Sequence, residues 1–324
     1  MFQNLLRIFT SKPARGAVSA GLLIFILYKF GAGQILNNIL SADPIFFASA
    51  VLVFIVSGIA GAKQWGILLG FHGIHLGFRG TVSRYFMGLF FNYVLPGVIG
   101  GDIIRVYQAA KASGKTTSAF SSTLADRVMG LLILVLFSLC GFLFLPSGPS
   151  MEALPVAVFM FLLLCGFIGL FALKPAGRIM SRAFGRFLPG EIRLKLSAVY
   201  HEMHQLTRAP SILLAILGTS IFIQLTRIGV HFLCGRAVGI ELGFMYFALF
   251  VPLMEITASI PISLGGVGVR EMMAVILFST VGVSQATVVS YTFLAYSSGF
   301  IGALPGSVAF MMSIKRGKKD PPGA

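Results

Sequence analysis

Charged side chains are scarce in this sequence of 324 residues, because Asp, Glu, Lys and Arg together make up only 11% of it. Acidic residues are the rarest of them, with 10 Asp and Glu against 25 Lys and Arg. Hydrophobic residues make up 56%, a composition that excludes an ordinary soluble globular domain and is typical of a polytopic helical membrane protein. The longest polar region, roughly Lys174–Pro210, is too short for a soluble catalytic domain.

Cysteine and histidine are few as well, with three and five residues. The cysteines lie in or at the edge of apolar segments, so we interpret them as small core residues without disulfide or metal-ligand spacing. No HExxH pattern, nucleotide-binding loop or nucleophile motif occurs. We therefore expect no metal, no other cofactor and no enzymatic activity.

The net charge of +15 does not indicate nucleic-acid binding, because the basic residues sit mainly between apolar segments, where they set orientation. Arg7, Lys12 and Arg15 precede the first predicted span, Ala17–Leu36, and further lysines follow the last span. This first apolar run lacks a small-residue cleavage site, so we expect a retained helix. The pattern predicts a multi-pass protein of a bacterial-type cytoplasmic membrane, with both termini cytoplasmic.

The most basic region carries four cationic residues at intervals of four, interleaved with apolar side chains. A helix with this spacing has a cationic stripe suited to an anionic leaflet surface. The alternative is an ordinary basic cytoplasmic loop. The residues of this basic stripe are Lys174, Arg178, Arg182 and Arg186.

Two apolar segments are interrupted in the same way. In Asn92–Arg105 and in Pro261–Glu271, a proline is followed by a glycine pair at +4 and +5 and by an arginine at +9. Broken backbone at membrane depth is tolerated only where protein or a water-filled cavity covers it. Basic residues flank Val82–Lys111 on both sides, which predicts a re-entrant hairpin from the cytoplasm. The second segment, Gly243–Val283, is either re-entrant from outside or two full spans.

An internal repeat underlies these breaks. The hexapeptide Gly73–Phe78 matches a second hexapeptide, Gly239–Phe244, much further along the chain. The separation of Pro96 and Pro261 along the sequence equals the separation of the two hexapeptides to within one position. Matching features in the same order and at nearly one spacing indicate that the chain contains two related halves.

The predicted topology makes these halves inverted. The first half is predicted to begin outside and the second inside, which is a transporter architecture. We thus predict an all-α polytopic membrane protein with inverted structural repeats and two re-entrant broken-helix hairpins. Within one membrane domain (1–324), repeat 1 is Pro44–Leu145, residues 146–209 form a linking span plus the basic region, and repeat 2 is Pro210–Met311.

Charged residues within apolar segments mark the candidate site, because each costs about 2.5–3.5 kcal/mol at the bilayer centre and must face a partner or a cavity. We expect Arg105 and Arg270, one per repeat, to hold a phosphate beside the half-helix N-termini. Asp102 and Glu271 would restrain these arginines, or bind a cationic group or a proton. Alternatively, all four only neutralise and cap the turns. The predicted substrate-binding set is Asn92, Gly100, Gly101, Asp102, Arg105, Gly265, Gly266, Arg270 and Glu271.

Further buried charges are candidates for gating or proton coupling. Asp126 and Arg127 could gate the cavity or form an interfacial ion pair. Glu255 lies deep in its segment without an adjacent basic residue and is a candidate proton site. Arg227 and His231, one helical turn apart, are interpreted as a polar contact between packed helices.

The sequence resembles the transmembrane, flippase-like region of the lysylphosphatidylglycerol synthase family, including its stand-alone members. The resemblance implies an integral-membrane lipid translocator. The soluble aminoacyl-transferase domain of the bifunctional members is not found in this sequence, so lysyl-lipid synthesis is not expected. The matching residues are Asn92, Leu95, Pro96, Gly100, Gly101, Asp102, Arg105, Asp126, Arg127, Gly130, Pro261, Ser263, Gly265, Gly266, Gly268, Arg270 and Glu271.

The leading hypothesis is a lipid flippase or scramblase that moves a phosphate-bearing head group, of a phospholipid or a polyprenyl-phosphate-linked lipid, through a charged site. One alternative is an ion-coupled transporter of a small anionic solute, which predicts a cavity closed to lipid. Another is a non-catalytic accessory subunit of glycolipid synthesis. The expected partners are membrane lipids and an anionic leaflet surface, with a homo-oligomer left open.

Overall fold

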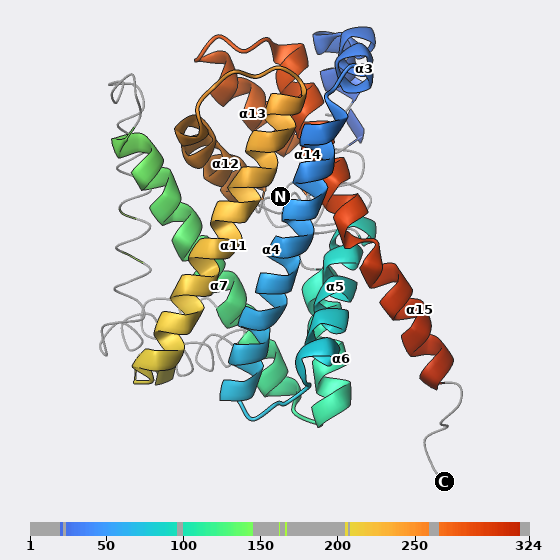
Figure 1. The fold of residues 1–324 in the computed structure, drawn as a ribbon, viewed down its shortest axis with the longest axis vertical. Coiled ribbons are helices and arrows are strands. Elements are labelled where there is room, and N and C mark those ends of the chain that lie inside the picture. The colour runs from blue at the N-terminus through green and yellow to red at the C-terminus, as the bar shows by residue number, and fades with distance from the viewer. Residues whose placement is uncertain are drawn as a thin grey trace, which may run out of the picture.

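The computed structural model describes residues 20–21, 24–95, 100–144, 162, 166, 205–206, 208–258 and 266–317. All regular elements within these ranges are helices, which confirms the all-helical class (Figure 1). The residues of the basic stripe, the break residues 96–99 and 259–265, and nearly all of the linking region lie outside the described residues. Their predicted structures therefore remain predictions.

Within the described ranges, four helices are long and apolar enough to cross a membrane. Three of them have 28 residues each, which corresponds to about 42 Å and exceeds the roughly 30 Å hydrocarbon core. The chain is therefore a membrane protein with several apolar helices. These helices are α4 (Pro44–Phe71), α7 (Thr116–Leu143), α11 (Pro210–Ala237) and the run from α14 (Gln285–Ala303) into α15 (Pro305–Gly317).

Shorter helices complete the two halves, two in each, with 17, 14, 15 and 11 residues. Each is shorter than the roughly 20 residues that a spanning helix needs. In Figure 1 the first two lie in the lower half of the molecule and the last two in the upper half. They are α5 (Phe78–Val94), α6 (Gly100–Ser113), α12 (Phe244–Ala258) and α13 (Val269–Ser279).

The order of long and short helices is the same in both halves. The first residues of α4 and α11 are as far apart in the sequence as those of α5 and α12. The pairs α6 and α13, and α7 and α14, depart from this spacing by only a few positions. The helix bounds therefore repeat in step with the repeated sequence motifs.

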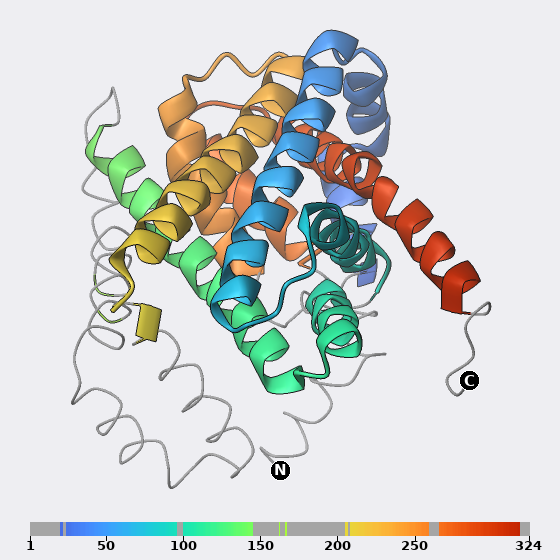
Figure 2. The same ribbon diagram turned by 60° about the horizontal axis from the view of Figure 1, so that its bottom comes forward.

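Helices α4 and α11 form the central antiparallel pair (Figures 1 and 2). At one end, the Asp43 amide donates to the Ala237 carbonyl oxygen at 2.9 Å. Near the midpoints of the two helices, the Ser57 hydroxyl lies 3.4 Å from the Ile223 carbonyl oxygen. At the other end, Leu68 and Ile216 belong to one buried cluster. Helices α4 and α11 thus contact each other along their lengths and run in opposite directions.

The repeated hexapeptide is a helix stop signal. After α4, Gly73 has φ +70° and the Ile74 amide bonds the Leu69 carbonyl five residues back. After α11, Gly239 has φ +81° and the Ile240 amide bonds to a carbonyl in the same way. This is the Schellman arrangement, in which glycine takes the left-handed conformation and the next residue is apolar. Both isoleucines are buried, so the stop also anchors each helix end in the core.

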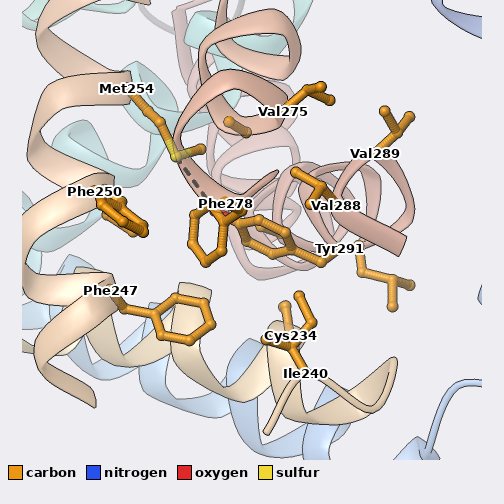
Figure 3. Close-up of a cluster of buried hydrophobic side chains, with 14 of the residues drawn as sticks. Cys234, Ile240, Phe247, Phe250, Met254, Val275, Phe278, Val288, Val289 and Tyr291 are labelled. Carbon is orange, nitrogen blue, oxygen red and sulfur yellow. Dashed lines mark hydrogen bonds between the residues drawn. The ribbon is translucent and has the colours of Figure 1, made fainter. Parts of the chain in front are cut away.

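Aromatic packing holds the second half together. The ring of Phe278 on α13 lies 5.1 Å from that of Phe247 on α12 and 5.2 Å from that of Tyr291 on α14. The Tyr291 hydroxyl donates to the Met254 sulfur at 3.4 Å (Figure 3). Such tilted and edge-on ring pairs add to the energy of apolar burial. The short helices α12 and α13 are therefore fixed against α14.

The first predicted span is corrected by the structure. The prediction of one helix over Ala17–Leu36 fails at Gly31, which has φ +82°. Residues 24–30 form one helical stretch, and α3 (Ala32–Leu40) begins after the glycine. A glycine in this conformation interrupts the helical hydrogen bonding, and periodicity alone does not reveal such a break.

The close packing of α5 on α6 predicts the effect of one glycine substitution. A methyl group at Gly101 would overlap the Gly88 carbonyl oxygen and the Asn92 side chain, whereas one at Gly218 on α11 would meet nothing. We expect Gly101→Ala to lower the free energy of unfolding by about 1–3 kcal/mol, the usual cost of overpacking. Thermal unfolding in detergent measures the change. Gly218→Ala is the control, and equal midpoints for both variants would contradict the packing described.

Candidate functional site

A cavity of about 520 Å³ lies between the two halves and is lined by residues of both. This volume far exceeds the roughly 30 Å³ of one water molecule and lies in the range of small-molecule sites. Its lining carries four arginines and three carboxylates in an otherwise apolar bundle. The charged lining residues are Asp102, Arg105, Asp126, Arg127, Arg227, Glu255 and Arg270.

The first charged cluster surrounds Arg105 on α6. Its Nη2 lies 2.7 Å from Asp126 Oδ2 on α7, and its Nη1 lies 3.5 Å from Asp102 Oδ1. The guanidinium carbon is also 4.7 Å from the Trp65 ring centroid and 4.4 Å from that of Tyr85. The Arg105 side chain is only 7% exposed. Two aromatic faces and two carboxylates therefore compensate a guanidinium that is almost removed from solvent.

The cluster extends across four helices. Arg127 Nε on α7 bonds Asp102 Oδ2 on α6. The Gln64 amide on α4 donates to Asp126 Oδ1 at 2.9 Å, and its oxygen accepts from Ser220 Oγ on α11 at 2.8 Å. The carboxylates thus tie the short helix α6 to the long helices of both halves. Each of these carboxylates accepts hydrogen bonds from more than one donor, so the bonds of the network can be redistributed among the donors.

The second charged cluster is smaller and more open. Arg270 Nε on α13 lies 2.9 Å from Glu255 Oε1 on α12, and His231 Nε2 on α11 lies 3.9 Å from the same oxygen. The Glu255 side chain is 34% exposed and that of Arg270 is 16% exposed. Both residues line the same cavity as Arg105. The structure therefore brings Arg105 and Arg270, predicted from the two breaks, to one polar chamber.

Of the two carboxylates expected to restrain the arginines, only Asp102 pairs with one of them, at 3.5 Å from Arg105. Asp126 and Glu255 lie closest to the two arginines, although both were predicted for gating or proton coupling. Glu271 is 2% exposed and accepts the Gly268 amide at 2.6 Å, so it caps α13 and does not line the cavity. The cause is helical geometry, because adjacent residues of a helix point in different directions.

Asp102 and Asn92 both line the cavity, and Asn92 provides the hydrogen bond to the start of α6. Asp102 pairs with Arg127 and Arg105, and no hydrogen bond in the described residues makes it a cap of α6. Instead, Asn92 Oδ1 on α5 accepts the Gly101 amide at 2.9 Å. Asn92 also lines the cavity, so it both holds α6 and faces the chamber.

The predicted glycines act through packing and turn geometry. Gly100 and Gly101 are buried in the first turn of α6, where they allow close contact with α5. Gly266 has φ +80°, which favours glycine in the turn before α13. None of the three belongs to the cavity lining that the described residues form, and Gly265 lies outside those residues.

Sequence reasoning missed one polar face of α11. Arg227 and His231 were interpreted as a helix-packing contact, but both line the cavity, together with Ser220 and Gln224. Positions 220, 224, 227 and 231 share one helix face, a signal that the sequence contains. Trp65, Tyr85 and Gln64 were also missed, because nothing in their local sequence pairs them with a charge.

Among the described residues, no group of three or more His, Cys, Asp or Glu side chains is placed to hold a metal ion. The carboxylates of the chamber instead face guanidinium groups.

These features define the class: a polytopic helical membrane protein with a charged chamber between two sets of helices. The chain belongs to the family of the lysylphosphatidylglycerol synthase transmembrane region, which it matches over residues 14–306. It is similar to a UPF0104 membrane protein of Pyrococcus horikoshii, with 23% identity over 300 residues, covering 86% of this chain and 89% of the relative. A UPF0104 membrane protein of Methanothermobacter thermautotrophicus is 24% identical over 316 residues, covering 90% and 93%.

The buried pair Arg105–Asp126 predicts a stability effect. Asp126→Asn leaves the guanidinium without its closest counter-charge, and we expect a loss of about 3–5 kcal/mol in the free energy of unfolding. The double variant Arg105→Gln/Asp126→Asn removes both charges and should recover part of that loss. Unfolding midpoints in detergent measure both effects. Arg127→Gln, which removes a 33% exposed side chain, is expected to cost less; a larger loss than for Asp126→Asn would refute this ranking.

Proposed function

We propose that this protein translocates a phosphate-bearing lipid head group across the membrane, without enzymatic activity. The observation that carries the proposal is the chamber lined by Arg105 of one half and Arg270 of the other. Charged side chains at membrane depth are expensive and are retained mainly along substrate or ion pathways. Membership of a family named for a lipid-synthase transmembrane region supports a lipid as the substrate.

The ion pairs suggest how the site works. Asp126 and Glu255 pair with Arg105 and Arg270, so each arginine of the proposed site already has a counter-charge. A phosphate that enters would compete with these carboxylates, because a guanidinium can hold phosphate through two parallel hydrogen bonds. When the phosphate leaves, the carboxylates pair again. The head group would cross through the chamber while its acyl chains remain in lipid.

The architecture fits a transporter built from two inverted halves around a central site. We infer that the two sets of helices are inverted repeats and that α5–α6 and α12–α13 are re-entrant hairpins from opposite sides. The short helices, their opposite halves in Figure 1 and the antiparallel α4–α11 pair support this inference. Inverted repeats with broken helices around a central site are the construction of many secondary transporters. We further propose that both termini face the cytoplasm.

Transport in liposomes tests the proposal. Purified protein is reconstituted with labelled phospholipids or labelled polyprenyl phosphates, and the exchange of label between leaflets is followed. We expect Arg105→Gln and Arg270→Gln to slow exchange about tenfold or more, since a charged hydrogen bond contributes about 1.5–3 kcal/mol. Arg236→Gln is the matched control, because Arg236 is an exposed arginine on α11 outside the cavity lining.

The double variant Arg105→Gln/Asp126→Asn is a control for misfolding. It removes both charges of the Arg105–Asp126 pair in the first cluster, so the loss of Arg105 leaves no unpaired Asp126. If wild-type protein moves no labelled lipid faster than protein-free vesicles, lipid translocation is refuted. If exchange occurs but neither arginine variant slows it, the chamber is not the path.

Accessibility to a membrane-impermeant thiol reagent tests the inverted arrangement. Lys111 lies in the last turn of α6 and Thr280 follows α13, and both are exposed. In a cysteine-free background, Lys111→Cys should react only from the cytoplasmic side and Thr280→Cys only from the opposite side. Labelling of both from one side would exclude the inversion.

A further inference from the structure

Arg227 differs from the other arginines of the chamber. Arg105, Arg127 and Arg270 each face a carboxylate. The side chain of Arg227 has no ion pair or hydrogen bond to any described residue, although Arg227 lines the same cavity. It is exposed near the middle of a helix long and apolar enough to cross a membrane.

The exposure of Arg227 is to the chamber. The exposed apolar residues of α11, which include Leu214, Phe222 and Leu225, lie away from the face that lines the cavity. Arg227 shares its face with Ser220, Gln224 and His231, all of which line the cavity. Along α11 it lies between Ser220, which bonds Gln64 of the first cluster, and His231, which lies beside Glu255 of the second. The group thus lies between the two clusters.

The charge balance follows from this placement. Four arginines and three carboxylates line the chamber among the described residues, which leaves one positive charge in excess when His231 is neutral. Because the other three arginines have counter-charges, the excess belongs to Arg227. One cation without an ion pair to a described residue, in a partly desolvated chamber, favours a ligand with one net negative charge.

We propose that Arg227 selects a singly charged phosphodiester head group, and that it is the first cationic group to hold the phosphate. This inference rests on the proposed function and narrows its substrate class. A phosphodiester without an amine carries one negative charge. A phosphate monoester carries about −1.5 to −2 at pH 7, and a head group with a built-in amine is neutral. Only the phosphodiester without an amine balances the single excess positive charge of the chamber.

Binding of short-chain lipids to detergent-purified full-length protein tests the inference. The probes are dihexanoyl forms of phosphatidylglycerol (one net charge), phosphatidylethanolamine (neutral) and phosphatidic acid (a monoester), with affinity measured by calorimetry. We expect wild type to prefer phosphatidylglycerol, and Arg227→Gln to lower its affinity for that lipid about tenfold while leaving that for phosphatidylethanolamine unchanged. Arg227→Lys keeps the charge and should retain most of the preference.

Arg236→Gln, on the same helix but outside the cavity, is the matched control and should bind like wild type. An unchanged preference in Arg227→Gln, or a wild-type preference for phosphatidic acid or phosphatidylethanolamine, overturns the inference. The acyl-free glycerophosphoglycerol separates a lipid from a soluble ligand of the same chemistry. If it binds as tightly as the lipid, the assignment of Arg227 is supported but the lipid function is contradicted. If phosphatidylglycerol binds through Arg227 yet does not exchange between leaflets, only translocation is refuted.

Discussion

The buried contact between Arg105 and Asp126 is the interaction on which the chamber depends. A guanidinium with 7% of its side chain exposed is tolerated because a carboxylate lies at 2.7 Å and two aromatic rings cover its faces. The contact joins α6 to α7, and Gln64 extends it to α4 and α11. The pairing of these charges therefore also sets the positions of a short helix and three long ones.

The scaffold around the chamber is built from repeated local signals. Helices α4 and α11 begin at a proline and end at the same Gly-Ile stop, and Ser57 contacts Ile223 near their midpoints. The short helices need glycine for close approach, as at Gly101 against Gly88. Two sets of helices with the same order thus enclose one cavity, with one charged cluster from each.

Much of this arrangement could be predicted from local sequence, because length, hydrophobicity and glycine position act within a few residues. The helical class, the regular spacing of the two halves and the participation of Arg105 and Arg270 in one chamber follow from such features. The ion pairs could not be predicted in the same way. Arg270 and Glu271 are neighbours in sequence, yet helix geometry turns Glu271 away. The true partners, Asp126 on α7 and Glu255 on α12, lie on other helices, where only tertiary packing decides the contact.

The unequal burial of the two ion pairs has a kinetic consequence. Asp126 and Arg105 are 8% and 7% exposed, whereas Glu255 and Arg270 are 34% and 16% exposed. If the chamber carries a phosphate head group, as we propose, the phosphate would meet two energy wells of different depth at the two arginines, and its dwell time at each would differ. Under this proposal, unequal wells would change how fast a lipid crosses, but by microscopic reversibility they would leave the equilibrium ratio between the two leaflets unchanged. A net accumulation on one side would require an external source of free energy, such as an ion gradient.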